Sequence, residues 1–552
     1  MLNKIWLFIS FLIITSLVFA QDKYWISFTD KNSSTYSINN PSEFLSQKAI
    51  ERRQNQNIPV VSNDLPVNQN YIDSIKSYNG IQILNKSKWL NGISVQVNDT
   101  TVLNNIFNLP FVDEVKLIYK FDTASQKISN KWDNELFVNN SALLRTNDFP
   151  LDYGYATNQI EMLNGDFLHE AGFKGEGMDI AIIDAGFMNV NNIAGFQQLW
   201  AEGRILGYKD FVNLDDGVFD EHSHGTSVLS TMAFYEEGVH IGVAPNANFW
   251  LLRSEDAPTE YLIEEYNWVS AAEYADSVGA YIINTSLGYT EFDDSTMNHV
   301  YNDLDGNTTV ITKGVDIAAS KGMLVVNSAG NSGIDPWYYI SAPADADSVL
   351  TVGAVDASGI IASFSSRGPT ADGRIKPDVC AQGQQTTVAI SNGNVVSGSG
   401  TSFSSPIITG MAACLWQAYP DLTAWQIRQA IVQSAHIYHK PNNDYGNGIP
   451  NFKQAYFNLA EYSVTNQDKD ELIQFYPNPV ANELNVVLYA SLDQTIAIKV
   501  FDLAGKMVFE DFIFSNKGRF NKISIPATWN KGYYILYIKT TGETFTRKVL
   551  KL

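Results

Sequence analysis

Four continuous apolar runs alternate with helical stretches in the middle of the chain, and this pattern restricts the fold more than any other feature. The runs cover residues 178–183, 249–252, 280–283 and 323–326. Helical stretches lie between them, for example at 261–277 and 309–321. Strands that are apolar on both faces and are joined by helices are typical of a parallel sheet covered on each side. We therefore predict an α/β unit with a doubly wound, mainly parallel sheet over residues 153–460.

In such a sheet, functional side chains gather at the carboxyl ends of the strands. Asp184 directly follows the first apolar run, and Gly186 lets the chain turn there. An isolated aspartate at such a point is more often a helix cap or an ion-pair partner, so Asp184 decides nothing by itself.

Two further residues stand where a Gly-Thr pair meets a helical run. Ser402 follows Gly400 and Thr401 and precedes the apolar run 407–415, while His224 lies next to a Gly-Thr pair of its own. A serine at a helix N-terminus lies beside unpaired N–H groups and the positive end of the helix dipole, which favour developing negative charge. Each motif alone is explained equally well by a small-residue turn before a core helix. We interpret the nearby His222 as a bystander.

Serine hydrolysis needs these residue types together. A serine hydroxyl is a weak nucleophile until a histidine takes its proton, and a buried carboxylate fixes the tautomer of that histidine. The oxyanion also needs a donor, and Asn331, after the run 323–326, can present its side-chain amide at the same edge of the sheet. A lone asparagine there is otherwise a turn residue.

The chain order Asp, His, Ser is that of subtilisin and differs from that of chymotrypsin and of the α/β-hydrolases. Over about 300 residues the chain resembles the subtilases. The resemblance is carried by the Asp184 motif, His224-Gly225-Thr226, Gly242-Val243-Ala244-Pro245, Asn284-Thr285-Ser286-Leu287-Gly288, Ala329-Gly330-Asn331, Ser363-Phe364-Ser365-Ser366-Arg367-Gly368-Pro369, Lys376-Pro377-Asp378 and Gly400-Thr401-Ser402.

The resemblance implies a role for each matching residue. Ser402 is expected to attack the peptide carbonyl, His224 to act as general base and then acid, and Asp184 to orient His224. The oxyanion is expected to bind the Ser402 N–H and the Asn331 amide. The resemblance also implies substrate-binding residues. An edge strand that pairs with an extended peptide is expected at Ser286, Leu287 and Gly288. The wall of the primary pocket is expected at Ala329 and Gly330.

Two positions depart from the common subtilase pattern. Phe403 stands directly after the nucleophile where many subtilases have methionine, and Tyr289 follows Gly288 where many have a second glycine. We expect Tyr289 to crowd the rim of the pocket and so to alter cleavage preference.

Residues 21–121 alternate short strands with helices and predict a small α+β unit of split βαβ type. Its position and the sequence Lys88-Trp89-Leu90-Asn91-Gly92-Ile93-Ser94-Val95 resemble the inhibitory propeptides of subtilases. The resemblance implies that this unit is an intramolecular inhibitor, with processing in the polar linker 122–152. The alternative is an ordinary N-terminal binding domain.

After a second polar linker, 461–473, strand-like segments separated by turn residues predict a small antiparallel β-sandwich over 474–552. The segment resembles the C-terminal sorting domain of type IX secretion cargo. The motifs that carry this resemblance are Tyr476-Pro477-Asn478-Pro479, Asp502-Leu503-Ala504-Gly505-Lys506, Lys531-Gly532-Tyr533-Tyr534 and the terminal Lys548-Val549-Leu550-Lys551-Leu552. The resemblance implies export across the outer membrane with the secretion machinery as partner. A carbohydrate-binding sandwich is the alternative.

Residues 1–20 have the pattern of a secretory signal peptide, with Lys4 before the apolar run 5–19 and a small-residue cleavage site at Ala20. The run is shorter than the ~20 residues that span a bilayer, and we predict no integral membrane segment in the mature chain. The net charge of −22 argues against nucleic acid as a partner.

Cys380 and Cys414 are the only cysteines. They can pair in an oxidising compartment, but we favour two free, buried thiols. Clustered His and Cys ligands are too few for a zinc site, so no metal is assigned and no cofactor is expected in the chemistry. Structural calcium at acidic loops such as Asp215-Asp216 or Asp293-Asp294 remains open, although acidic surface loops are the simpler interpretation.

We therefore predict a secreted serine endopeptidase that is made as a preproprotein and acts on polypeptides. An inactive cell-surface scaffold or adhesin is the alternative from another class. An esterase that uses the same triad is disfavoured, because an edge strand at Ser286 to Gly288 suits extended peptides.

Overall fold

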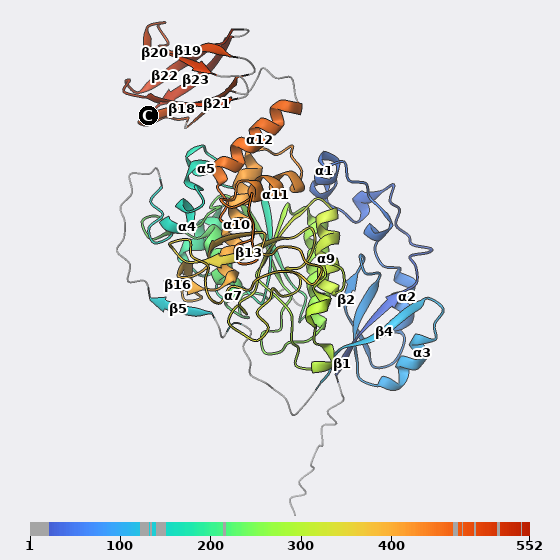
Figure 1. Ribbon diagram of the computed structural model, residues 1–552. Helices are drawn as coiled ribbons and strands as arrows, with labels where there is room; N and C mark the ends of the chain where they lie inside the picture. The colour runs from blue at the N-terminus through green and yellow to red at the C-terminus, as the bar shows by residue number, and fades with distance from the viewer. Residues whose placement is uncertain are drawn as a thin grey trace, which may run out of the picture.

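The computed structural model describes residues 21–121, 132, 135–139, 151–213, 217–466, 473–476, 478–490, 493–515, 519–541 and 544–552. Within these ranges the chain forms an N-terminal α+β unit, a central α/β unit and a C-terminal β unit, as Figure 1 shows. The predicted signal peptide, 1–20, most of the predicted linker 122–152 and residues 467–472 of the predicted linker 461–473 lie outside the described residues.

The N-terminal unit is a four-stranded antiparallel sheet with the order β2-β3-β1-β4. Its elements are β1 (Asp22–Phe28), α1 (Gln47–Asn55), α2 (Gln69–Lys76), β2 (Ile81–Ser87), β3 (Gly92–Val97), α3 (Leu103–Phe107) and β4 (Val112–Tyr119), with 3₁₀ turns at Pro41–Glu43, Ser62–Asp64 and Thr100–Val102. Apolar residues of α2 and α3 pack on one face of the sheet and close a core of their own. The predicted α+β unit is confirmed.

The central unit contains a seven-stranded sheet in which all neighbouring strands are parallel. The order is β14-β13-β12-β11-β6-β10-β7. The strands are β6 (Asp179–Asp184), β7 (Ile205–Asp210), β10 (Asn248–Arg253), β11 (Ile282–Thr285), β12 (Leu324–Ser328), β13 (Leu350–Val355) and β14 (Val379–Gln382). This confirms the predicted doubly wound α/β fold.

Helices cover both faces of this sheet because successive side chains of each strand point to opposite sides. Ile180 and Ile182 of β6 pack in one core with residues of α7 (His224–Ala233) and α10 (Thr401–Ala418). Their neighbours Ala181 and Ile183 pack in a second core with α8 (Ile263–Val278) and α9 (Val310–Ser320). The continuous apolar runs of the sequence are thus strands buried on both sides.

The remaining elements of the central unit are short, apart from two helices near its end. They are α4 (Thr157–Glu161), α5 (Asp166–Glu170), α6 (Gln197–Ala201), α11 (Ala424–Gln433), α12 (Phe452–Asn466), β8 (Tyr235–Glu236), β9 (His240–Ile241), β15 (Thr386–Ala389), β16 (Val395–Ser399) and 3₁₀ turns at Ala194–Phe196, Ser295–Met297 and Tyr301–Asp303. β15 and β16 form a small antiparallel sheet whose third strand, β5 (Leu136–Asn139), comes from the segment that joins the first two units.

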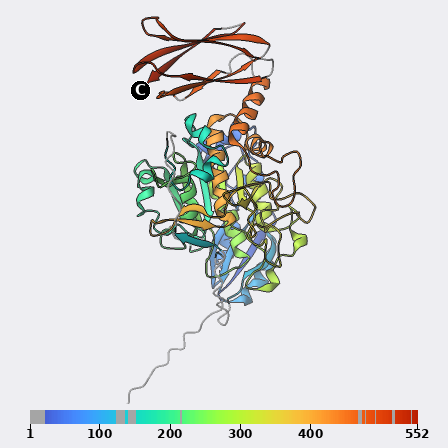
Figure 2. The same cartoon turned by 60° about the vertical axis from the view of Figure 1, so that its left-hand side comes forward.

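The C-terminal unit consists of two antiparallel sheets, which Figure 2 shows as stacked layers. One sheet contains β17 (Ile473–Tyr476), β18 (Glu483–Ala490) and β21 (Arg519–Pro526), and the other contains β19 (Gln494–Asp502), β20 (Met507–Ser515), β22 (Gly532–Lys539) and β23 (Thr544–Lys551). Alternate residues of β19, among them Ile496, Ile498 and Val500, are buried in the core between the sheets. The predicted β-sandwich is confirmed.

Two other expectations can be compared with the described residues. No helix among them is long and apolar enough to cross a membrane. Cys380 and Cys414 are both free and buried, as favoured from the sequence.

Candidate active site

The predicted site residues meet at one edge of the central sheet. Asp184 is the last residue of β6, and the segments that carry Ser286 and Asn331 follow the ends of β11 and β12. His224 begins α7 and Ser402 is the second residue of α10. Since all these strands are parallel, their carboxyl ends bring residues far apart in sequence to the same place.

Asp184 and His224 form a buried pair. The His224 Nδ1–H donates to Asp184 Oδ1 over 2.7 Å, and both side chains are almost fully excluded from solvent. The Ala185 N–H donates to the same carboxylate oxygen, also over 2.7 Å. These contacts fix the Asp184 side chain and leave the His224 Nε2 atom directed away from it.

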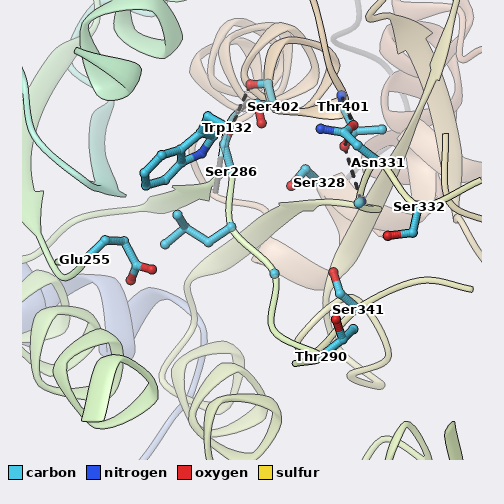
Figure 3. A pocket seen from close by; sticks show the side chains of 13 residues that line it. Trp132, Glu255, Ser286, Thr290, Ser328, Asn331, Ser332, Ser341, Thr401 and Ser402 are labelled. Carbon is cyan, nitrogen blue, oxygen red and sulfur yellow. Dashed lines mark hydrogen bonds between the residues drawn. The ribbon is translucent and has the colours of Figure 1, made fainter. Parts of the chain in front are cut away.

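Ser402 lies at the start of the long buried helix α10 and lines a cavity of about 150 Å³. The Ser286 hydroxyl donates to the Ser402 carbonyl oxygen over 2.9 Å, so the turn that carries the serine is tied to the segment after β11. Figure 3 shows this cavity with Ser402 on its wall. The other lining residues are Trp132, Glu255, Ser286, Leu287, Gly288, Thr290, Ser328, Gly330, Asn331, Ser332, Ser341 and Thr401.

Asn331 is held with its side-chain oxygen turned away from the cavity. Its Oδ1 atom accepts hydrogen bonds from the Thr401 N–H and the Thr401 hydroxyl, both at 2.9 Å. The amide nitrogen therefore points into the cavity, on the side where Figure 3 draws Ser402. The structure brings the predicted oxyanion donor to the predicted nucleophile.

The pocket wall differs from the sequence prediction at two residues, Ala329 and Tyr289. Ser286, Leu287, Gly288 and Gly330 line the cavity, but the Ala329 side chain packs into the core beside α8 and α9. Alternation explains this, because Ser328 and Gly330 face the cavity and the residue between them faces the opposite way.

The expectation that Tyr289 crowds the pocket rim is wrong. Tyr289 exchanges backbone hydrogen bonds with Ala342, its side chain is buried, and its hydroxyl donates to Glu255 over 2.5 Å. This pairing turns the ring into the core, and Thr290 lines the cavity in its place.

Two residues of the joining segment, Trp132 and Glu135, also lie in the site. The Trp132 ring stacks on His224 with centroids 4.8 Å apart and on His222 with centroids 4.5 Å apart. Glu135 Oε1 lies 3.3 Å from His224 Nε2. The hydrogen bonds of the described residues do not include one between Ser402 and His224.

The charges around His224 govern its protonation. Burial is the largest influence and favours the neutral ring, but the Asp184 and Glu135 carboxylates together outweigh it and raise the pKa of His224 to about 10. With Glu135 in place, the ring therefore carries a proton on both nitrogens near neutral pH.

Three family models match the chain. The model described as the subtilase family matches residues 175–448, the peptidase S8 propeptide domain of Bacteroidota matches 23–135, and the secretion system C-terminal sorting domain matches 474–551. Among curated proteins, a thermostable alkaline protease of Halalkalibacterium halodurans is 31% identical over 291 residues, which are 52% of this chain and 70% of that protein. Subtilisin DY of Bacillus licheniformis is 31% identical over 301 residues, which are 54% of this chain and 97% of that protein.

The chain belongs to the subtilase family. It is a subtilisin-family serine endopeptidase with a propeptide domain and a sorting domain, as the sequence predicted. The sorting domain indicates secretion across the outer membrane, to the cell surface or beyond.

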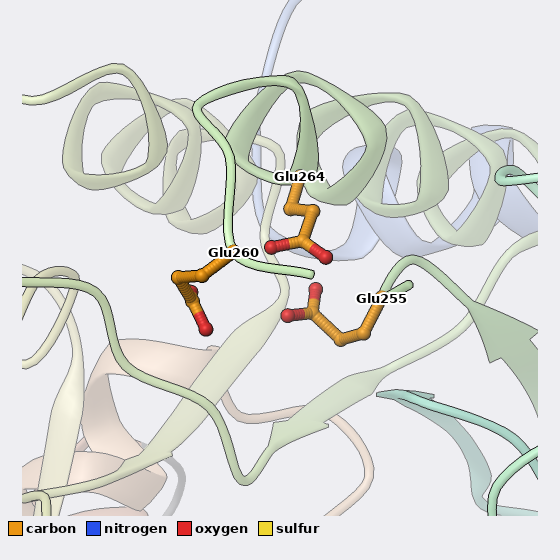
Figure 4. Close-up of side chains that lie close together, drawn as sticks. All are labelled: Glu255, Glu260 and Glu264. Carbon is orange, nitrogen blue, oxygen red and sulfur yellow. The ribbon is translucent and has the colours of Figure 1, made fainter. Parts of the chain in front are cut away.

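Three acidic residues of this subtilase form a cluster, and one of them, Glu255, lines the cavity. Carboxylate oxygens of Glu255, Glu260 and Glu264 lie within 4.8 Å of one another. Figure 4 shows the three side chains together. Hydrogen bonds already engage this group: Glu255 accepts from the Ser254 and Tyr289 hydroxyls, and Glu264 accepts from the Asp256 N–H. We assign no metal to this group.

Of the two acidic loops considered for calcium, the described one, at Asp293-Asp294, belongs to no further cluster of candidate metal ligands. Asp294 accepts from the Thr296 N–H and hydroxyl, and Asp293 accepts from the Glu260 N–H, so both carboxylates stabilise turns of the subtilase unit. Asp215 and Asp216 lie outside the described residues.

Sequence reasoning missed Trp132 and Glu135. Both lie in a polar linker with no helix or strand periodicity, and neither belongs to a subtilase catalytic motif. It also treated His222 as a bystander, whereas its Nδ1 accepts from the His224 N–H and its ring contacts Trp132. One sequence signal for these neighbours of His224 was available: the adjacent Gly-Thr turn has little bulk and leaves room for other side chains close to the histidine.

Proposed function

We propose that Asp184, His224 and Ser402 are the catalytic triad that hydrolyses peptide bonds through an acyl-enzyme. The Ser402 Oγ attacks the substrate carbonyl carbon while His224 Nε2 takes its proton. Asp184 keeps the second proton of the ring on Nδ1 and stabilises the imidazolium that forms. The observation that carries this proposal is the buried 2.7 Å pair of Asp184 and His224 at the cavity that Ser402 lines.

The negative oxygen of the tetrahedral intermediate is proposed to bind between the Asn331 amide and the Ser402 N–H. The orientation of Asn331 supports this, because its oxygen is engaged by Thr401 and its nitrogen faces Ser402. The start of α10 adds the positive end of the helix dipole. His224 then gives its proton to the leaving amine, and water hydrolyses the acyl-enzyme by the same steps in reverse.

Polypeptides in extended conformation are the proposed substrates. Ser286, Leu287 and Gly288 line the cleft beside Ser402, where an extended chain can pair with their backbone. The wall next to Ser402 is made of small or hydroxyl-bearing residues, namely Gly288, Gly330, Ser328, Ser332 and Ser341. We expect cleavage after residues of small or medium size in preference to large aromatic ones.

The N-terminal unit is proposed to inhibit the enzyme until self-processing removes it. It covers α8 with an aromatic and ionic surface: Trp25 stacks on Tyr266 with centroids 4.5 Å apart, and Glu273 accepts from the Ser87 hydroxyl and the Trp89 N–H. The joining segment then enters the catalytic cleft at Trp132. We expect the first cut between residues 122 and 152.

The proposed chemistry needs no cofactor, because the nucleophile, base and oxyanion donors are all side chains or backbone groups of the chain. Chelation by EDTA is expected to leave the kcat of the mature enzyme unchanged. No structural calcium site is assigned, and the melting temperature with and without EDTA tests whether the fold needs calcium.

The outer-membrane secretion machinery is the proposed partner of residues 474–552. Removing these residues is expected to retain an active enzyme in the periplasm, because their core is built from their own strands. Fractionation of cells that produce the full and the shortened chain tests this. No nucleic acid is expected as partner for a chain of net charge −22.

Casein hydrolysis by the full chain, beside a Ser402→Ala variant, tests the proposed function. The unaltered chain is expected to lose its N-terminal unit, seen by intact mass, and then to digest casein. The variant is expected to stay full-length and inert. If both proteins behave alike, Ser402 is not a working nucleophile, and the scaffold or adhesin becomes the better interpretation. An ester substrate cleaved without casein cleavage points to an esterase.

A further inference from the structure

Glu135 stands where the catalytic serine has to act. Its carboxylate oxygen Oε1 lies 3.3 Å from His224 Nε2. A Cβ atom placed on Gly400 lies 2.9 Å from that same oxygen, so the carboxylate also touches the turn that carries Ser402. The Glu135 side chain is only 1% exposed. Glu135 is thus inserted between the base and the residues next to the nucleophile.

Contacts on both sides of Glu135 hold it in this place. On one side, the Trp132 ring covers His224, and the Glu135 N–H donates to the Trp132 carbonyl oxygen over 2.9 Å. On the other side, β5 pairs antiparallel with β16, with Leu136 opposite Ser399. The Phe137 ring packs against the ring of Phe403, the residue after the nucleophile, with centroids 5.9 Å apart.

The chemistry of this contact opposes catalysis. His224 must have an unprotonated Nε2 to take the Ser402 proton. A carboxylate at Nε2 instead stabilises a proton there, and the second carboxylate, Asp184, holds the proton at Nδ1. The ring is clamped as an imidazolium between two carboxylates, and in that form it cannot act as a base.

Stability alone gives no reason for a carboxylate at this point. Glu135 Oε2 is buried and has no hydrogen-bond partner among the described residues. A buried carboxylate oxygen without a partner costs free energy that an apolar side chain would not.

We propose that Glu135 is the inhibitory residue of the precursor: it binds the Nε2 side of His224 in competition with Ser402 and holds the base in its protonated form until the joining segment leaves the cleft. Departure of the segment leaves the ring with Asp184 and Ser402 as partners. This inference rests on the proposed function, since it assigns the regulation of the same triad.

The first test measures the protonation of His224 in a protein that cannot process itself. In the Ser402→Ala full chain with ¹⁵N-labelled histidine, both ring nitrogens of His224 are expected to stay protonated at pH 7.5. Glu135→Gln in this background is expected to lower the proton affinity of the ring at least about tenfold. The other titratable groups near the ring, Asp184 and His222, are unchanged. Glu176→Gln, an exposed site on a loop, is the matched control and is expected to leave the titration unchanged.

The second test follows self-processing of the chain with Ser402 intact. Glu135→Gln is expected to release the N-terminal unit at least about tenfold faster than the unaltered chain at pH 7.5. Glu135→Asp keeps the charge on a side chain that is one methylene shorter. Its rate of release is expected to lie between those of the unaltered chain and Glu135→Gln. Glu176→Gln again serves as control.

The two tests separate this inference from the proposed function. If the unaltered chain neither processes itself nor digests casein, the proposed function fails, and the titration of His224 still decides the role of Glu135. If the chain is an active protease but Glu135→Gln titrates and processes like the parent, the inhibitory role of Glu135 is overturned.

Discussion

Asn331 is fixed by Thr401, which donates both its N–H and its hydroxyl to the Asn331 side-chain oxygen at 2.9 Å. A flipped amide would place its NH₂ group against two donors, so only one orientation satisfies the pair. The same Thr401 hydroxyl accepts from the Gly330 N–H over 3.2 Å. The residue before the nucleophile therefore sets the direction of the oxyanion donor.

Asn331→Ala is expected to lower kcat by about 10² to 10³, the loss that subtilisin itself shows without its side-chain oxyanion donor. The donor acts on the oxygen only as charge develops, so KM for a peptide substrate should change little. Steady-state kinetics of the processed enzyme measure both constants. A large rise in KM with unchanged kcat would place Asn331 in substrate binding instead.

Thr401→Val keeps the backbone donor but removes the hydroxyl, so the Asn331 amide is held by one hydrogen bond in place of two. One such bond contributes roughly 1 kcal/mol, and we expect kcat to fall about five- to tenfold with KM nearly constant. Thr401→Ser retains the hydroxyl and is the matched control. Equal rates for the Val and Ser variants would show that the hydroxyl does not position Asn331.

The sequence motifs were sufficient to predict the residues that end strands or begin helices. Asp184, His224, Ser402 and Asn331 each stand next to a periodic element and inside a family motif, and a parallel sheet leaves one edge for them to meet. Strands without a continuous apolar run were harder to recognise. In β13, Thr351 and Gly353 interrupt the apolar run, and β7 has the alternating burial of an edge strand.

Side-chain direction and long-range docking could not be predicted in the same way. Ala329 faces the core because of a strand register that the motif does not encode, and Tyr289 turns inward because of its pairing with Ala342. Glu135 reaches His224 only because the N-terminal unit binds α8 and β5 pairs with β16. Such a contact depends on the assembled precursor and leaves no local pattern in the linker.

Acid is expected to destabilise the precursor through two buried histidines. Burial lowers the pKa of both His169 and His240 to about 4, below the value near 6.5 of an unfolded chain. The unfolded state therefore binds more protons below pH 6.5, and the stability that these neutral rings provide is lost as pH falls from about 6.5 towards 4.

His240→Gln tests the acid effect, because glutamine can still donate to the Ser230 carbonyl oxygen that His240 Nε2 contacts at 2.8 Å. Urea unfolding at pH 7 and pH 5 in the Ser402→Ala background measures this effect. Between pH 7 and pH 5, His240→Gln is expected to lose less unfolding free energy than the parent. His439→Gln, at an exposed site, is the control. If His240→Gln loses as much unfolding free energy as the parent between pH 7 and pH 5, the His240 ring does not contribute to acid destabilisation.

A buried ionic contact joins the propeptide domain to the catalytic domain, and its removal is expected to weaken the precursor. Arg52 and Arg53 of α1 contact Asp276 of α8 at 2.5 and 2.8 Å, and all three side chains are almost fully buried. Burial alone would raise the pKa of Asp276, but the positive charges of Lys88, Arg52 and Arg53 outweigh it and lower the pKa. Asp276→Ala leaves two buried guanidinium groups without this carboxylate.

The expected cost of Asp276→Ala is about 3 to 5 kcal/mol in the unfolding free energy of the Ser402→Ala precursor, as for other broken buried pairs. Glu202→Ala removes a pair in which Glu202 is 48% exposed, with Arg204 at 2.7 Å, and is expected to cost less than about 1 kcal/mol. Urea unfolding monitored by tryptophan fluorescence compares the two variants. Similar small losses for both would show that Asp276 is not needed to bind the propeptide domain, and that the aromatic contact of Trp25 with Tyr266 carries more of the interface.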